Sequence, residues 1–248
     1  MLVWYGLRAR ALGAWWATQT PHPVDNPLLR LDGVERLATA LGLVARYVGL
    51  TIFPVTLSAD YSGGTIPTEA GLLRPLPLAG LAILLGCVAL AAAGLLPAIR
   101  GSATPTSDAR RVRAFAATLF VAPYLVIGNV FVPIGTIFAE RLLYLPSAGL
   151  CLLGGALLGT LALDYPAFPN WSSDQRIRYG GLILVLLVAA FAVRTYGRAL
   201  TWQDDRTVFA AVASSHPECP RAWVILGNQD VDAGRLAQGL DALFRSVG

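Results

Sequence analysis

The sequence contains few charged residues and no lysine. Only 14% of its 248 residues are charged, and all 19 basic residues are arginine. Soluble globular chains carry roughly 25% charged residues. A fraction this low, together with 55% hydrophobic residues, excludes an ordinary soluble domain, a disordered chain, a secreted disulfide scaffold and a soluble nucleic-acid binder. Most of the chain is expected to lie in lipid, and the arginine bias is typical of a GC-rich, bacterial coding sequence.

Cysteine and histidine, which often signal metal or redox chemistry, are also scarce. The cysteines Cys87, Cys151 and Cys219 have no spacing typical of a metal site, and the two histidines lie in proline-containing loops. The sequence holds no phosphate-binding loop, dinucleotide fingerprint or nucleophile elbow. We therefore predict no metal site.

Charge-free stretches set the expected architecture, because a helix that spans a bilayer needs about 20 apolar residues. Three long stretches lack charged residues altogether, namely 75–99, 114–139 and 142–163. A fourth run, 179–197, has Arg194 near its end, and a fifth, 37–57, has Arg46 near its middle. The sequence predicts an all-α, polytopic helical membrane protein with about five spans. The expected spans, within a membrane domain of 37–200, are 37–57, 76–99, 114–135, 147–164 and 179–197.

Arginine counts in the short connections give an expected orientation, because cytoplasmic connections carry more basic residues. With five spans, the counts are high at 1–36, 98–113 and 164–178 and low at 57–75 and 135–146. This pattern places 1–36 on the cytoplasmic side, as an amphipathic segment, and the C-terminus on the other side. We expect an integral protein of a bacterial inner membrane. The orientation depends on counting 37–57 as a span.

The chain changes character after Trp202, where it becomes polar and helical. Within a soluble segment of 201–248, the stretch 220–248 matches one incomplete tetratricopeptide repeat. One helical hairpin leaves an apolar face uncovered, and about three repeats are needed for stability. Both ends of the chain therefore suggest a fragment of a longer protein. The residues expected to pack the repeat are Trp223, Leu226, Gly227, Gly234, Gly239 and Leu243.

The stretch 135–149 holds the most informative polar group. Glu140 and Arg141 lie at the boundary between two apolar runs, and Tyr144, three residues after Arg141, shares its helix face. A guanidinium at that depth can bind a lipid phosphate with two hydrogen bonds, with the tyrosine as a second donor. The alternative is an interfacial anchor with a Glu–Arg pair.

Two further polar positions are left with alternatives. Asp60, followed by Tyr61, either binds a sugar hydroxyl or acts as a base, or it solvates the start of a Gly-Gly turn. Arg46 either faces a polar cavity or an acidic partner within the membrane, or faces water from an amphipathic helix in the interface. Gly155 and Gly159 are interpreted as a helix-packing pair.

Four elements together resemble a known family. They are Asp25-Asn26-Pro27, the Leu-Ser-x-Asp-Tyr-Ser motif at 57–62 with Ile66-Pro67, the Ala-Glu-Arg-Leu-Leu-Tyr-Leu-Pro-Ser string at 139–147, and the repeat after the last span. Taken in order, they resemble the transmembrane and tetratricopeptide repeat-containing (TMTC) family, over nearly the whole chain. The string at 139–147 is the most specific element. Val126-Ile-Gly-Asn129 departs from the family pattern, which has serine before the asparagine.

The family is similar to C-type membrane glycosyltransferases, which use a polyprenyl-phosphate sugar such as dolichyl-phosphate mannose. Members of the family are associated with O-mannosylation. The resemblance implies the second half of the membrane domain plus the first repeat. Its implied partners are membrane lipid, a polyprenyl-phosphate-linked sugar and a protein acceptor, without nucleic acid. The acidic catalytic loop lies outside this chain, so no catalytic residue or cofactor is expected here and the chain alone is expected to be inactive. A divalent metal in the full-length enzyme stays open.

The resemblance adds weight to Arg141 and Tyr144 as contacts of a lipid phosphate. The candidates for donor binding are Glu140, Arg141, Tyr144, Arg46, Asp60 and Tyr61. The alternative function is a non-catalytic, membrane-anchored tetratricopeptide scaffold that binds partner proteins.

Overall fold

The computed structural model describes residues 6, 10, 22–99, 107–163 and 172–247. Every regular element among them is helical, which confirms the predicted all-α fold. Within the described residues, three helical segments are long and apolar enough to cross a membrane: Pro75–Pro97, Glu140–Gly159 and Ile177–Trp202. In chain order, the elements are the short 3-10 helix η1 (Pro27–Arg30), α2 (Gly33–Ile52), α3 (Pro75–Ile99), α4 (Asp108–Ile127), η2 (Glu140–Leu143), α5 (Tyr144–Leu163), α6 (Ser173–Ala199), η3 (Leu200–Trp202), α7 (Asp205–Ser215), α8 (Pro220–Asp232) and α9 (Leu236–Arg245).

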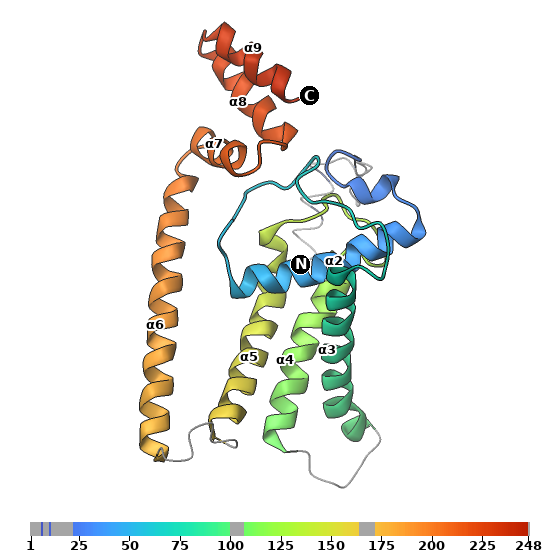
Figure 1. Ribbon diagram of the computed structural model, residues 1–248, viewed down its shortest axis with the longest axis vertical. Helices are drawn as coiled ribbons and strands as arrows, with labels where there is room; N and C mark the ends of the chain where they lie inside the picture. Colours follow the sequence, from blue (N-terminus) through green and yellow to red (C-terminus); the bar gives the residue numbers. More distant parts are fainter. Residues whose placement is uncertain (1–5, 7–9, 11–21, 100–106, 164–171, 248) are drawn as a thin grey trace.

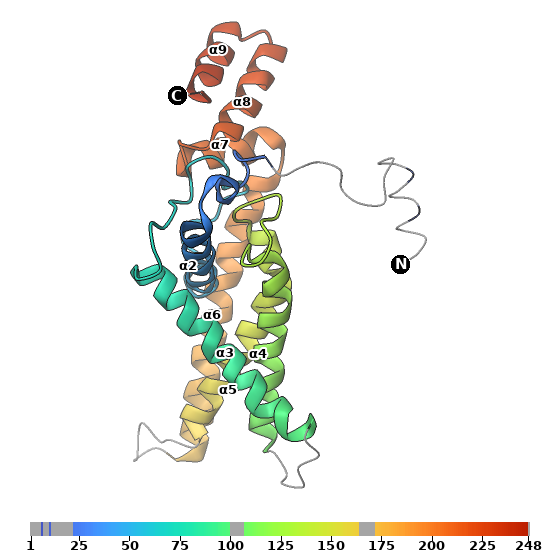
Figure 2. The same cartoon turned by 90° about the vertical axis from the view of Figure 1, so that its right-hand side faces the viewer.

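Helices α3, α4 and α5 lie side by side and form a bundle (Figure 1, Figure 2). The bundle core includes Phe120 and Tyr124 of α4, both fully buried. Helices α4 and α5 approach closely at Gly149, where an added Cβ would lie 2.5 Å from the backbone nitrogen of Phe120. The expected packing pair, Gly155 and Gly159, is not at this contact, because an added Cβ at either would meet no atom within 4 Å. Among the described residues, Gly155 and Gly159 pack against no other helix, so their interpretation as a helix-packing pair is wrong.

The expected span 114–135 is shorter in the structure, because α4 ends at Ile127. Asn129 follows with a φ of 57°, a left-handed conformation that does not continue a helix. Its amide nitrogen donates to two carbonyl oxygens further along the same loop, and its side-chain oxygen accepts a hydrogen bond from Asn26 at 2.9 Å. Residues 128–139 are consequently a folded loop at the end of the bundle.

Helix α2 lies across the ends of α3, α4 and α5 in Figure 1 and is seen nearly end-on in Figure 2. The Asp32 side chain caps its first turn, and α2 crosses α3 where Gly80 would bring a Cβ within 1.8 Å of the Leu41 carbonyl oxygen. The expected span 37–57 is therefore not aligned with the membrane bundle. The arrangement fits the alternative of an amphipathic helix in the interface.

Residues 22–36 and the C-terminal helices lie at the same end of the bundle (Figure 1). The N–H of Gly63 donates to the Val24 carbonyl at 2.8 Å, and Arg221 of α8 forms an ion pair with Asp25. The described part of 1–36 and the C-terminal helices thus lie at one end of the bundle, whereas five spans would place them at opposite ends, because α2 runs across the bundle instead of through it. We call this the repeat end.

Helix α6 connects the opposite end of the bundle to α7, α8 and α9 at the repeat end (Figure 1). Ser172 and Gln175 form a capping box at its start. Its apolar side chains are exposed along its length. Near its end, the Arg194 Nε donates to the Pro54 carbonyl at 2.9 Å, so α6 is tied to the segment that follows α2.

Helices α8 and α9 form a hairpin in which the expected packing positions meet. Gly234 has a φ of 76° in the turn between them. An added Cβ at Gly227 would lie 2.8 Å from Leu243 and 3.0 Å from the carbonyl oxygen of Gly239. The two remaining positions pack against α7; they are Trp223 and Leu226. The assignment of this hairpin as a tetratricopeptide repeat stays a prediction.

Candidate functional site

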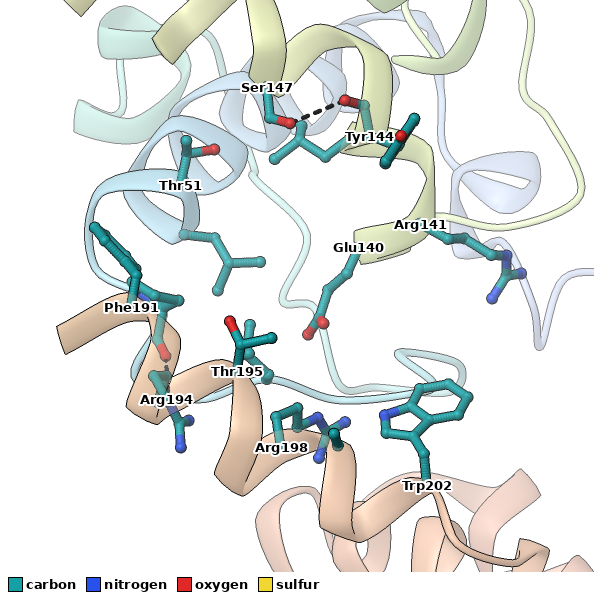
Figure 3. A pocket seen from close by; sticks show the side chains of 15 residues that line it. Thr51, Glu140, Arg141, Tyr144, Ser147, Phe191, Arg194, Thr195, Arg198 and Trp202 are labelled. Carbon is teal, nitrogen blue, oxygen red and sulfur yellow. Dashed lines mark hydrogen bonds between the residues drawn. The ribbon is translucent and has the colours of Figure 1, made fainter. Parts of the chain in front are cut away.

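A cavity of about 540 Å³ lies at the repeat end, between the end of α2, the start of α5 and the end of α6 (Figure 3). Apolar side chains such as Leu50, Leu143 and Phe191 form much of its wall. Its charged groups are one glutamate and three arginines. We call it the apolar cavity.

Glu140 points into the apolar cavity (Figure 3). Its carboxylate accepts hydrogen bonds from the motif at 57–62. Its Oε1 accepts the Tyr61 hydroxyl at 2.7 Å and the N–H of Ser58 at 2.6 Å. Burial, with the hydrogen bond to Glu140, raises the pKa of Tyr61, so its hydroxyl keeps its proton and remains a donor. The structure therefore brings two predicted site residues, Glu140 and Tyr61, into one hydrogen-bonded group.

Arg141 and Tyr144 line the same cavity, Arg141 from η2 and Tyr144 from the first residue of α5. Both side chains are exposed, Tyr144 at 86%. Arg141 forms no ion pair within the part of the chain that the structure describes. Its guanidinium is consequently available to an anion at the mouth of the cavity.

Two arginines of α6 that the sequence did not single out as site residues also line the cavity. Arg198 lies 6.0 Å from the centre of the Trp202 ring, a cation–π contact. Arg194 donates to the carbonyl oxygens of Pro54 and Val55, which fixes the segment after α2. The four-residue spacing of Arg194, Arg198 and Trp202 places them on one helix face, and that spacing is the signal in the sequence that would have found them.

Asp60 faces the repeat hairpin instead of the apolar cavity. Its Oδ2 accepts a hydrogen bond from Arg221 at 2.8 Å, and Arg221 also pairs with Asp25. Burial raises the pKa of Asp60, but the hydrogen bonds from Ser62 and the Arg221 guanidinium outweigh it and hold the pKa below its ordinary value. A carboxylate with a lowered pKa is a poor general base, and this geometry fits a structural role for Asp60 better than a role as a base.

The junction around Asp60 is closely packed. The Cys219 side chain is fully buried, with its sulfur 3.5 Å from the Ser62 hydroxyl. Gly63 has a φ of 70°, and an added Cβ there would lie 2.3 Å from Pro220. The motif at 57–62 therefore contacts Glu140 of the membrane part through Tyr61, and it contacts Arg221 of the hairpin through Asp60.

Arg46 lies outside the apolar cavity, on α2. Its Nη2 is 3.7 Å from Oε1 of Glu69, and the exposed fractions of the two side chains are 27% and 16%. The N–H of Glu69 donates to the Thr39 hydroxyl of the same helix at 2.9 Å. Arg46 thus pairs with an acidic residue from a helix that lies across the bundle, and the pair ties the connection between α2 and α3 to α2.

The cavity is suited to binding an amphipathic anion. It combines guanidinium and phenol donors with an apolar wall, which matches an anionic group on an apolar tail. In the described ranges of the chain, no group of three His, Cys, Asp or Glu side chains lies together as a metal ion requires.

The fold and cavity define a helical membrane protein that carries a helical hairpin above a cavity with cationic groups. The chain is 26% identical over 216 residues to Protein O-mannosyl-transferase Tmtc3 of Drosophila melanogaster, covering 87% of this chain and 22% of that protein. It is 35% identical over 128 residues to Protein O-mannosyl-transferase Tmtc1 of Drosophila melanogaster, covering 52% of this chain and 14% of that protein. It is 27% identical over 204 residues to Protein O-mannosyl-transferase TMTC3 of Mus musculus, covering 82% of this chain and 20% of that protein.

These relatives confirm the resemblance predicted from the sequence, and the chain is related to the TMTC proteins. The chain spans only 14% to 22% of the length of the three relatives. No family model and no solved structure matches it.

Proposed function

We propose that this chain is the donor-binding part of a membrane glycosyltransferase, and that the apolar cavity holds the phosphate end of a polyprenyl-phosphate sugar. One observation carries the proposal: Arg141 and Arg198 line a largely apolar cavity, and neither has an ion pair in the described segments. An isoprenoid tail suits the apolar wall, and a phosphate suits the guanidinium groups. The names of the relatives, protein O-mannosyl-transferases, support glycosyl transfer as the reaction class of the longer protein.

Four polar residues of the cavity have a stated role in this proposal. Arg141 and Arg198 bind the phosphate, and Tyr144 adds a neutral donor. Glu140 repels the phosphate, and its hydrogen bonds with Tyr61 and Ser58 keep its carboxylate on one side of the cavity.

The repeat hairpin has the second role, to present a protein acceptor or bind a partner. This proposal is supported by its position, because Arg221 docks the hairpin at the end of the bundle that carries the apolar cavity. An acceptor bound by the hairpin would be held close to the lipid-linked sugar.

The test measures binding of polyprenyl phosphate to the full chain in nanodiscs. Arg141→Ala and Arg198→Ala each lower the affinity about tenfold or more, because each removes a charge-assisted hydrogen bond to phosphate. Arg74→Ala is the matched control: it removes an exposed arginine near the start of α3, outside the cavity, and leaves the affinity unchanged. Polyprenol, which lacks the phosphate, binds wild type and variants alike.

Equal loss of affinity in all three arginine variants would mean that binding is only general attraction to the basic protein. Wild-type affinity in both cavity variants would favour the alternative, a non-catalytic scaffold, because that function does not need the cavity.

A further inference from the structure

A second cavity, of about 420 Å³, lies where the membrane part meets the repeat hairpin. Its wall comes from the motif at 57–62, the start of α7 and the start of α8. It shares Arg141 and Trp202 with the apolar cavity. We call it the junction cavity. The two cavities are neighbours, and the two shared side chains stand between them.

The junction cavity differs from the apolar cavity in chemistry. Three aspartates, two arginines and Gln203 line it. Only one carboxylate, that of Glu140, lines the apolar cavity. A ligand that passes from one cavity to the other therefore leaves an apolar wall, meets Arg141 and enters a site rich in hydrogen-bond acceptors.

Some polar groups of the junction cavity are already engaged, and others are available. Asp60 is bonded to Arg221, and Asp204 caps α7 by accepting the N–H of Thr207 at 2.7 Å. The side chains of Gln203 and Asp205 form no hydrogen bond or ion pair in the described part of the chain. They can accept hydrogen bonds from a ligand.

Trp202 adds an apolar surface beside these acceptors. Its side chain is 58% exposed, and its ring is held by Arg198 at 6.0 Å. An indole ring with polar acceptors next to it suits a ligand that has both an apolar face and hydroxyl groups, as a pyranose ring does. An anion is less favoured here than in the apolar cavity, because three carboxylates accompany two guanidinium groups here, against one carboxylate and three guanidinium groups there.

We propose that the junction cavity binds the sugar of the lipid-linked donor, with Gln203 and Asp205 as acceptors for its hydroxyl groups. The inference rests on the proposed function, and it assigns residues to the sugar. The order of the site, from apolar wall to Arg141 to hydroxyl acceptors, is the order of a polyprenyl-phosphate sugar, from tail to phosphate to pyranose.

The experiment compares two probes, polyprenyl phosphate and polyprenyl-phosphate mannose, on the full chain in nanodiscs. The ratio of their dissociation constants isolates the contribution of the sugar. Wild type binds the mannose-bearing lipid about tenfold more tightly, a gain on the scale of one charge-assisted hydrogen bond. The double variant Gln203→Ala with Asp205→Asn lowers this ratio to about one, and its affinity for bare polyprenyl phosphate stays at the wild-type value, which also shows that it is folded.

Asp232→Asn is the matched control, because it removes one exposed aspartate charge from α8, outside both cavities, and keeps the wild-type ratio. A wild-type ratio of one, or an unchanged ratio in the double variant, would overturn the sugar site and leave the phosphate site standing. A double variant that loses binding of a serine-containing peptide but keeps the ratio would assign the cavity to the acceptor and also overturn it. Absence of phosphate-dependent binding in wild type would instead overturn the proposed function.

Discussion

At the residue scale, Arg221 joins two carboxylates from distant parts of the chain. It pairs with Asp25, ahead of η1, and with Asp60, in the motif at 57–62. The side chain of Asp60 is only 13% exposed, and its Oδ1 also accepts the N–H of Ser62 at 2.7 Å. A buried carboxylate with this many donors is stabilised in its charged form, so removal of its charge weakens these hydrogen bonds and sets a neutral group against the Arg221 guanidinium.

The first prediction concerns Asp60→Asn, measured as the free energy of unfolding of the purified chain. We expect a loss of about 1 to 3 kcal/mol at neutral pH, the scale of a charged hydrogen bond. The folded pKa of Asp60 is below its ordinary value, so its stabilisation is complete above that ordinary value and is lost as pH falls through the folded value. The difference in the free energy of unfolding between wild type and variant is therefore smaller at about pH 3 than at neutral pH.

The control for this prediction is Asp232→Asn. Asp232 is exposed and forms no ion pair in the described residues, so the variant unfolds like wild type at both pH values. If Asp60→Asn lowers the free energy of unfolding by the same amount at neutral pH and at about pH 3, the charge of Asp60 does not stabilise its contact with the hairpin.

Local sequence predicts site residues only where neighbours in the chain are neighbours in space. Arg141 and Tyr144 are three residues apart, and they line one cavity as expected. The contact between Asp60 and Arg221 spans 161 positions, so no local pattern indicates it. Arg198 was missed although its four-residue spacing from Arg194 and Trp202 is visible in the sequence, because its place in the cavity depends on where α6 ends relative to α5.

At the element scale, the lengths of apolar runs predict helices well and their ends poorly. The charge-free run at 75–99 corresponds to α3, because a long apolar run has no other stable form in lipid. The apolar run at 114–139 extends beyond α4, which ends at Ile127. Asn129 lies outside the helix, where its side chain donates to carbonyl oxygens of its own loop and accepts a hydrogen bond from Asn26. That partner is 103 positions away, which a run of apolar residues does not reveal.

The second prediction compares two glycines of α5. Gly149→Ala places a Cβ 2.5 Å from the backbone nitrogen of Phe120, so α4 and α5 must move apart, and we expect a loss of about 1 to 3 kcal/mol. Gly155→Ala meets no atom within 4 Å, and alanine favours a helix over glycine by about 1 kcal/mol, so stability is kept or rises. Thermal unfolding in detergent measures both.

The two variants make the same chemical change in the same helix, so each is the control of the other. Equal stability changes in the two would contradict the close contact between α4 and α5 at Gly149.

At the scale of the whole molecule, the position of α2 decides which segments share a side of the membrane. A spanning α2 would separate Arg30 and Arg36 from the repeat hairpin. In the structure α2 lies across the bundle, so both arginines lie at the repeat end. The alternation of arginine counts that gave the expected orientation therefore does not hold for this segment.

The third prediction uses single cysteines in a chain without its native ones, and a maleimide that does not cross membranes. Arg30→Cys, before α2, and Gln238→Cys, on α9, are both exposed, and we expect them to react from the same side of sealed vesicles. Arg110→Cys, at the exposed start of α4, reacts from the opposite side. If α2 spans the bilayer, Arg30→Cys reacts together with Arg110→Cys. The comparison separates the two arrangements of α2 whichever side is cytoplasmic, because it depends only on which positions react together.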